Sequence, residues 1–333
     1  MTKANEKLID RFGREVTYVR FSVTDRCDFR CEYCMAEEMT FLPRQQILTL
    51  EEFYLLGKAF TEMGVRKIRL TGGEPLIRSN IIWLCEKLAA LPGLDELVLT
   101  TNGSQLTQYA KQLKDAGVKR INISLDSLNA GKFRKITRVG DLSKVLAGID
   151  AAREQGFENI KINSVILKGY NDDELIPLMD FILDRNLDIT FIEEMPLGNV
   201  SPRDRALSYM SSDEIRQILS DRFSLVGSTV STGGPSKYYQ FDGSSSKVGF
   251  ISPHSHNFCS TCNRVRVTSE GRLLLCLGNE HSMDLRERLR SHPGELEPVK
   301  QALRESMEIK PERHYFDLNE APQIVRFMNM TGG

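Results

Sequence analysis

The feature that most constrains the fold is an alternation of short apolar strands and amphipathic helices between residues 15 and 223. The predicted strands cover 15–24, 67–71, 96–101, 120–125, 160–167 and 189–193. The predicted helices cover 49–63, 79–91, 105–116, 141–155, 172–185 and 212–223. Six strand-then-helix units predict a parallel sheet with right-handed crossovers. We therefore expect an α/β fold with a partial (βα)6 barrel of the TIM type.

The pattern changes after residue 195, where strands become shorter and Ser, Thr and Gly more frequent. Short strands are predicted at 238–241, 247–251, 264–268 and 273–276, and helices at 284–290 and 295–309. The last two strands are expected to form a hairpin. This predicts three parts: an N-terminal segment, 1–14, a barrel, 15–227, and a C-terminal α+β region, 228–333.

Composition excludes several classes of protein. The 333 residues are 41% hydrophobic and 27% charged, with a formal net charge of -1. A chain without basic excess is not expected to bind nucleic acid. The N-terminus lacks the apolar core of a signal peptide, and no run approaches the roughly 20 apolar residues of a membrane helix. We predict a cytoplasmic protein without membrane contact.

Three cysteines follow the first predicted strand, at Cys27, Cys31 and Cys34. A tetrahedral zinc site needs a fourth ligand, and none lies nearby in the sequence. Three thiolates on a cubane iron–sulfur cluster would instead leave one iron open. The other strand ends also carry polar residues, among them TGGEP at 71–75 and TTNG at 100–103. Ligands of such barrels bind at this end of the strands, so we expect the site there.

A second set of cysteines consists of Cys259, Cys262 and Cys276. The spacing of these cysteines is also typical of zinc ribbons, in which His254, His256 or His281 would be the fourth ligand. The spacing alone therefore fits either a zinc ion or an iron–sulfur cluster. Arg264 and Arg266 lie on one face of the following strand. Two guanidinium groups beside a metal site favour binding of phosphate groups.

The first cysteine set, with Tyr33 before its last thiol, resembles the signature of the radical S-adenosylmethionine superfamily. The resemblance implies a 4Fe-4S cluster on Cys27, Cys31 and Cys34, whose open iron binds S-adenosylmethionine and generates a 5′-deoxyadenosyl radical. It also implies that the residues holding this cofactor are Tyr33, Gly73, Ser124 and Met195. The alternative interpretation of Met195 is that it is a residue of the hydrophobic core.

Within this superfamily the chain resembles the enzymes that cyclise GTP at the first step of molybdenum cofactor synthesis. The motifs are SVTDRC at 22–27, GGEP at 72–75, TTNG at 100–103, CSTCNRVR at 259–266 and the terminal Gly332 and Gly333. The resemblance implies a second 4Fe-4S cluster on Cys259, Cys262 and Cys276, and a Gly-Gly tail that enters the site. The implied GTP-binding residues are Arg20, Lys67, Arg69, Thr100, Lys161, Arg264 and Arg266.

The same resemblance implies partners. These are an electron donor such as flavodoxin or ferredoxin, and the next enzyme of the pathway, cyclic pyranopterin monophosphate synthase. A homodimer is also expected, because twofold dimers are the commonest oligomers. Two alternatives stay open from the sequence: a radical peptide-modifying enzyme with an auxiliary cluster, and a zinc-binding protein without catalysis.

Overall fold

The computed structural model describes residues 6–198, 205–241, 243–318 and 324–332. Its strands are β1 Tyr18–Ser22, β2 Lys67–Thr71, β3 Glu96–Thr101, β4 Arg120–Ser124, β5 Ile160–Val165, β6 Asp188–Ile192, β7 Leu225–Gly227, β8 Lys237–Phe241, β9 Lys247–Ile251, β10 Arg264–Val267, β11 Arg272–Leu274 and β12 Ser282–Asp284. Its helices are α1 Leu50–Glu62, α2 Ile81–Ala89, α3 Leu106–Asp115, α4 Ala130–Thr137, α5 Leu142–Glu154, α6 Leu175–Arg185, α7 Arg205–Ser208, α8 Ser212–Ser220, α9 Leu285–Ser291, α10 Glu297–Glu308 and α11 Met328–Thr331.

All strands belong to one sheet, in the order β12-β11-β10-β1-β2-β3-β4-β5-β6-β9-β8-β7. The six predicted barrel strands are neighbours and run parallel, which confirms the expected α/β barrel. The C-terminal region adds one parallel strand at each edge, β10 beside β1 and β9 beside β6. The sheet therefore continues through the boundary predicted at residue 228. The division into three parts stays a prediction.

The two faces of the central strands differ in polarity. Outward side chains such as Phe21 are apolar, and its ring packs 5.6 Å from Phe53 and 5.9 Å from Phe60 of α1. Inward side chains are polar, and Arg20 of β1 lies between Arg69 of β2 and Arg266 of β10 in the strand register. Parallel strands buried on both faces are normally apolar throughout. The polar inner face therefore indicates a polar ligand inside the barrel.

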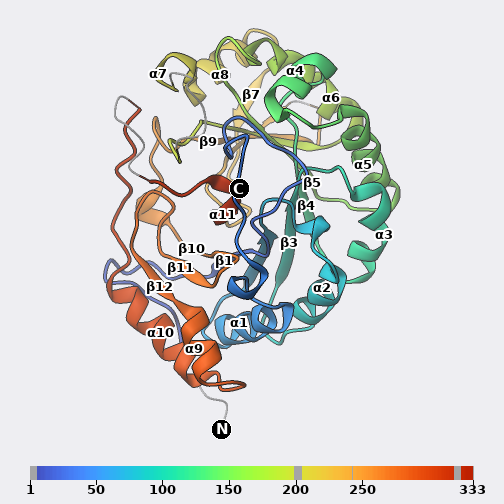
Figure 1. The fold of residues 1–333 in the computed structure, drawn as a ribbon. Coiled ribbons are helices and arrows are strands. Elements are labelled where there is room, and N and C mark those ends of the chain that lie inside the picture. The colour runs from blue at the N-terminus through green and yellow to red at the C-terminus, as the bar shows by residue number, and fades with distance from the viewer. Residues whose placement is uncertain (1–5, 199–204, 242, 319–323, 333) are drawn as a thin grey trace.

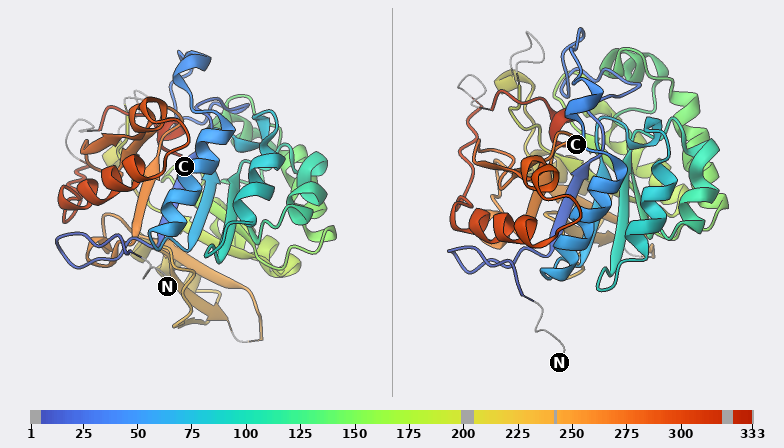
Figure 2. Two further views of the ribbon diagram at one scale, coloured as in Figure 1. Left: turned by 90° about the horizontal axis from the view of Figure 1, so that it is seen from below. Right: turned by 60° about the horizontal axis from the view of Figure 1, so that its bottom comes forward.

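The helices form an outer layer around the strands. Figure 1 shows α1 to α6 along the outside, and the C-terminal end beside α11 within the ring. Both views in Figure 2 show the same layer of blue-to-green helices outside the strands. The helices therefore cover the outer, apolar face of the strands, and the end of the chain approaches the polar inner face.

Local signals predicted most of the elements. The capping box of α1 is confirmed, because Thr49 Oγ1 accepts from the Glu52 amide at 3.1 Å and the Glu52 carboxylate accepts from the Thr49 amide at 2.7 Å. Elements α4, α7, β7, β12 and α11 were not predicted. The last four are three or four residues long, too short for a periodic pattern. The predicted strand 273–276 ends earlier, at Leu274, so Cys276 lies beyond the strand.

Candidate functional site

The loop after β1 brings Cys27, Cys31 and Cys34 to the wall of one cavity of about 150 Å³. The loop folds back on itself, because the Cys34 amide donates to the Cys31 carbonyl oxygen at 3.0 Å. The Phe29 amide donates to Cys27 Sγ at 3.3 Å. All three cysteines are free thiols. One short loop thus presents three thiols to the same space.

The glycines after β2 allow this loop to pack closely on the next strand end. The Gly73 amide donates to the Thr24 carbonyl oxygen at 2.8 Å, and the Glu74 amide donates to the Arg26 carbonyl oxygen at 2.8 Å. A Cβ atom on Gly73 would lie 2.2 Å from the Arg26 carbonyl oxygen. A side chain at this position would therefore push the cysteine loop away from β2.

Glu74 joins the ends of β2 and β3. Its carboxylate is 0% exposed and accepts from Thr101 Oγ1 at 2.8 Å and from the Asn102 amide at 2.7 Å. Burial raises the pKa of Glu74 to about 8, against the lowering effect of these hydrogen bonds. The carboxyl group is thus a structural anchor for the strand ends that surround the first cavity.

The four residues predicted to hold the cofactor, Tyr33, Gly73, Ser124 and Met195, all line this first cavity. The Tyr33 hydroxyl donates to Asp126 Oδ2 at 2.7 Å. Asp126 also lines the cavity and was not predicted as a site residue. Burial raises its pKa to about 6. Its position two residues after Ser124, at the end of a strand, is the signal that could have identified it.

Cys259, Cys262 and Cys276 line a second cavity of about 170 Å³. Cations surround this set. Lys310, which is 1% exposed, has its Nζ atom 3.9 Å from Cys262 Sγ and donates to the Leu275 carbonyl oxygen at 2.9 Å. Arg14 donates to the Cys259 carbonyl oxygen at 2.8 Å. Enclosure raises the pKa of Cys262, but Arg264, Lys310 and Arg14 outweigh this effect and lower it overall.

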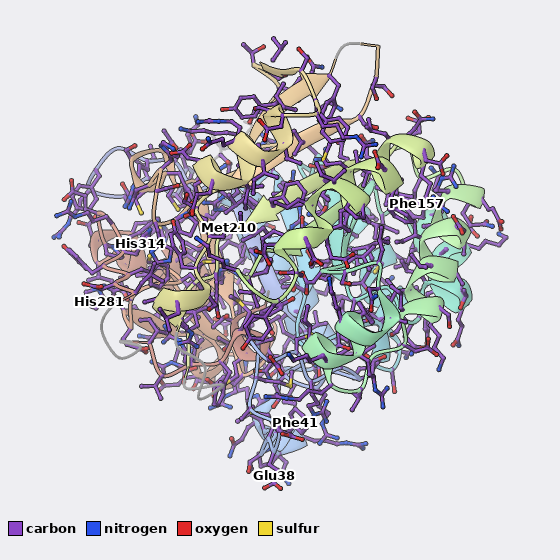
Figure 3. All side chains as sticks on the ribbon, turned by 90° about the horizontal axis from the view of Figure 1, so that it is seen from above. Glu38, Phe41, Phe157, Met210, His281 and His314 are labelled. Carbon is purple, nitrogen blue, oxygen red and sulfur yellow. The ribbon has the colours of Figure 1, made fainter. Side chains whose placement is uncertain are left out.

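Two of the three histidines considered as zinc ligands have other side-chain contacts. His254 Nε2 lies 2.9 Å from the Glu194 carbonyl oxygen, and His256 Nε2 lies 2.9 Å from Asp213 Oδ2. The histidine that lines the second cavity is His314. Figure 3 shows His314 and His281 on the C-terminal side of the molecule, away from Phe41 and Glu38. Within the described ranges, no three His, Cys, Asp or Glu side chains are grouped to hold one metal ion.

Five of the predicted GTP-binding residues line the second cavity: Arg20, Arg69, Lys161, Arg264 and Arg266. The other two lie beside it. Lys67 is paired with Glu96 and donates to the Thr232 carbonyl oxygen at 2.8 Å. Thr100 lines the first cavity, and its hydroxyl accepts from Arg69 Nη1 at 2.9 Å. The sheet therefore gathers side chains from β1, β2, β5 and β10 into one cationic cluster.

The positive charges of the cationic cluster repel one another. Enclosure and the charge of Arg264 lower the pKa of Arg266 to about 10. Burial, together with Arg266, Arg69 and Arg264, lowers the pKa of Arg20. Among the residues that the structure describes, Arg69, Lys161, Arg264 and Arg266 have no ion pair with a carboxylate, unlike Lys67 and Arg120, which both pair with Glu96. A multiply charged anion would relieve this repulsion.

Tyr18, which was not predicted, lies within this cluster. It is 3% exposed, lines the second cavity, and its hydroxyl accepts a hydrogen bond from Arg69 Nε. Burial raises the pKa of Tyr18, but the charges of Arg69, Arg20 and Lys67 outweigh it and lower the pKa to about 7. Alternate side chains of a strand point to the same face, and Tyr18 lies two residues before Arg20 in β1. This shared inward orientation is the signal that could have identified Tyr18.

The end of the chain reaches the cationic cluster, as the resemblance implied for the tail. Arg266 Nη1 donates to the carbonyl oxygen of Gly332 at 2.5 Å and of Thr331 at 3.4 Å. Gly332 has φ of 77°, and a Cβ atom there would lie 2.3 Å from Thr71 Cγ2. Glycine alone suits this approach. Gly333 lies outside the described residues.

Comparison with known proteins decides the family. Residues 21–182 match the model of the Radical SAM superfamily, and residues 187–316 match Molybdenum Cofactor Synthesis C. A GTP 3′,8-cyclase of Saccharophagus degradans is 62% identical, with 99% of each chain covered. A GTP 3′,8-cyclase of Pseudomonas putida is 60% identical over 100% of both.

The chain belongs to the GTP 3′,8-cyclase family. Among solved structures, the fold resembles Streptococcus suis SuiB bound to precursor peptide SuiA, with a TM-score of 0.61 at 14% identity, over 96% of this chain and 77% of that one. SuiB bound to S-adenosylmethionine gives 0.58 at 15% identity, over 88% and 69%. These two likenesses concern the fold, and confirm the expected barrel with a C-terminal extension.

Membership of the GTP 3′,8-cyclase family within the radical superfamily implies a 4Fe-4S cluster and S-adenosylmethionine. The first thiol set fits such a cluster, because its three free thiols line one cavity and a cubane takes each thiolate on a different iron. Burial raises the pKa of Cys34 to about 12, so cluster binding releases protons. No described helix is long and apolar enough to cross a membrane.

Proposed function

We propose that this chain converts GTP to (8S)-3′,8-cyclo-7,8-dihydroguanosine 5′-triphosphate, the first step of molybdenum cofactor synthesis. The observation that carries the proposal is the pairing of two adjoining cavities, each walled by three thiols, with the cationic cluster on the side of the second. This arrangement suits a radical cofactor on one side and a nucleoside triphosphate on the other. Membership of the cyclase family favours it over the peptide-modifying and zinc-binding alternatives.

The first cluster would be held by Cys27, Cys31 and Cys34, and S-adenosylmethionine by Tyr33, Gly73, Ser124 and Met195. When bound, they supply the radical that removes a hydrogen atom from the substrate. A second 4Fe-4S cluster would be held by Cys259, Cys262 and Cys276. The support for the second cluster is that these three free thiols line one cavity with Lys310 and Arg264 nearby.

The triphosphate would be bound by Arg20, Arg69, Lys161, Arg264 and Arg266, with Lys67 and Thr100 beside them. Guanidinium groups hold phosphate oxygens through two parallel hydrogen bonds. Arg266, Arg20 and Arg69 are register neighbours on β10, β1 and β2, so their side chains rise from one level of the sheet. A row of this kind holds a chain of phosphates in a single orientation.

The reaction rearranges GTP without changing its composition. The bond between the ribose 3′ carbon and its hydrogen breaks, and that hydrogen leaves in 5′-deoxyadenosine. The 3′ carbon bonds to carbon 8 of guanine, and nitrogen 7 gains a hydrogen as one proton and one electron, the electron coming from the external donor. The role of the protein is to hold the ribose and the base in the reacting geometry and to exclude water. The apolar residues Ile192, Met195 and Met328 line both cavities and suit the second task.

Product analysis after anaerobic incubation with GTP, S-adenosylmethionine and a reductant tests the proposal. We expect a cyclised isomer of GTP and one 5′-deoxyadenosine for each product. Deuterium at the 3′ position of GTP should appear in 5′-deoxyadenosine. Cleavage of S-adenosylmethionine that does not depend on GTP would favour the peptide-modifying alternative.

The remaining partners stay predictions. They are flavodoxin or ferredoxin as electron donor, cyclic pyranopterin monophosphate synthase as the next enzyme, a homodimer, and a cytoplasmic location. A preparation that contains zinc and no iron would have no cluster to reduce, and the protein would then need no electron donor. Mixing each candidate donor with the reconstituted enzyme and measuring turnover would test them directly.

The affinity for GTP is expected to depend on pH through Tyr18. The groups that face its hydroxyl side are Arg20 of β1, Lys67 and Arg69 of β2, and Arg264, its register partner on β10. Above a pH of about 7 the phenol becomes a phenolate in the substrate-free protein, neutralises part of the cationic cluster, and opposes the triphosphate. Relative to Tyr18→Phe, wild-type affinity should fall by up to about tenfold per pH unit.

The measurement is the dissociation constant of GTP between pH 6.5 and 8.5 for both proteins. Ionisation of GTP itself cancels in the ratio of the two constants. A ratio that stays constant across this range would show that Tyr18 keeps its proton in the substrate-free protein.

Lys310 is expected to support the second cluster. Three thiolates make the cluster anionic, and a buried ammonium beside Cys262 and Leu275 stabilises negative charge there. Replacement Lys310→Met should shift the reduction potential of the second cluster to a more negative value and increase loss of iron. Lys310→Arg, which keeps the charge, should restore most of both. Wild-type potential and iron content in Lys310→Met would contradict this role.

A further inference from the structure

The two cavities meet at a seam formed by four residues. Asn163, Ile192, Met195 and Met328 line both cavities. Among these four, Asn163 alone has a polar side chain that can form two or more hydrogen bonds. A polar side chain at this otherwise apolar seam indicates that a ligand bound in the seam forms a hydrogen bond with it.

A second asparagine lies beside Asn163 on the inner face. Asn122 lines the second cavity and is 4% exposed. In the strand register it is opposite Lys161, two residues before Asn163. The Oδ1 atoms of Asn122 and Asn163 are both buried, and neither accepts a hydrogen bond from any part of the chain that the structure describes. Buried side-chain oxygens are normally satisfied, so these two indicate a missing donor.

The geometry points to the ribose of the nucleotide as that donor: we propose that Asn163, with Asn122, binds the ribose hydroxyl groups and makes the site selective for ribonucleotides. This inference rests on the proposed function. In that reaction the ribose must lie between the cofactor cavity, where the hydrogen is taken, and the cationic cluster, where the phosphates are bound. The seam is that place, and Lys161 marks the phosphate side only two residues along β5.

The chemistry of the seam fits a sugar. Hydroxyl groups donate to amide oxygens, and the carbon skeleton of the ring can contact Ile192, Met195 and Met328. A 2′-deoxynucleotide lacks one donor and would leave an asparagine oxygen buried without a partner. Sites built to hydrogen-bond a hydroxyl discriminate strongly against an analogue that lacks it. We thus expect Asn163 and Asn122 to determine specificity for the sugar. The cations bind the phosphates and do not distinguish between sugars.

The test compares GTP, 2′-deoxy-GTP and 3′-deoxy-GTP on the anaerobically reconstituted enzyme with S-adenosylmethionine. Dissociation constants are measured for the wild type and for Asn163→Leu, Asn122→Leu and Ser164→Ala. We expect the wild type to bind at least one deoxy analogue about tenfold or more weaker than GTP. Asn163→Leu should weaken GTP by a similar factor and leave that analogue nearly unchanged, so that discrimination is lost.

Ser164→Ala is the matched control. Ser164 is the next residue of β5, faces away from the cavities, and also has a buried oxygen without a partner. It should keep wild-type discrimination. Asn122→Leu serves as the second variant should Asn163→Leu lose iron. An equal loss of affinity for GTP and both analogues in the asparagine variants would overturn the inference. If discrimination is found but no cyclised product forms, the proposed reaction fails and the ribose site stands.

Discussion

Cys31→Ala is expected to abolish cyclisation of GTP and to reduce the iron of the reconstituted protein from about eight to about four per chain. Cys31 is the middle thiol of the first set, and its loop is fastened by the amide of Cys34. Two thiols remain in this set, and they are too few to hold a cubane against loss. The second set, on a different cavity, should keep its iron.

Iron analysis and product analysis on the same anaerobic preparation check this result. Cys85→Ala is the matched control, because Cys85 is a free thiol in the core of α2 and lines neither cavity. It should retain both clusters and the activity. Loss of about half the iron from Cys85→Ala, or turnover by Cys31→Ala, would contradict the assignment of the first thiol set.

Arg266→Met is expected to weaken GTP binding by about tenfold to a hundredfold and to stabilise the substrate-free protein. Hydrogen bonds between charged partners contribute roughly 1.5–3 kcal/mol each, which sets the loss of affinity. The gain in stability follows from charge repulsion, since enclosure and Arg264 already lower the pKa of Arg266. Replacement of a poorly compensated cation by an apolar side chain of similar length removes this cost.

Calorimetric titration with GTP and thermal unfolding of the substrate-free protein measure the two effects. We expect the melting temperature to rise by a few degrees. Arg290→Ala is the control, because Arg290 pairs with Glu52 on the surface. Such a pair contributes roughly 0–1 kcal/mol, and its loss should not affect GTP. A lower melting temperature together with full GTP affinity in Arg266→Met would refute both parts.

The barrel strands and the grouping of the cysteines into two sets could be predicted from the sequence because their signals are local. Apolar runs at intervals of about 30 residues indicate the parallel units. The spacing of Cys27, Cys31 and Cys34 restricts them to one loop, and the capping box at Thr49 and Glu52 marks the start of α1. These signals act over a few residues and do not depend on how the elements pack.

The composition of the site was harder to predict, because it depends on which strands become neighbours. Nothing in the local pattern of 264–267 shows that β10 pairs with β1, more than 240 residues earlier, and brings Arg264 beside Tyr18. The buried Lys310 follows α10 at the end of a helix, where a lysine is normally solvated. Tyr18, Asn122 and Lys310 were therefore missed, although the first two have the inward parity of their strands.

By itself, the sequence determined the α/β class, the two sets of three thiols and the resemblance to a radical enzyme family. Residue type and short spacing suffice for these, since thiols close in sequence must share a loop. Tertiary structure alone decided that the two thiol sets face adjoining cavities, that cations from four strands meet in one of them, and that Asn163 lies at the seam. Those contacts join residues far apart in the chain, and only closure of the sheet brings them together.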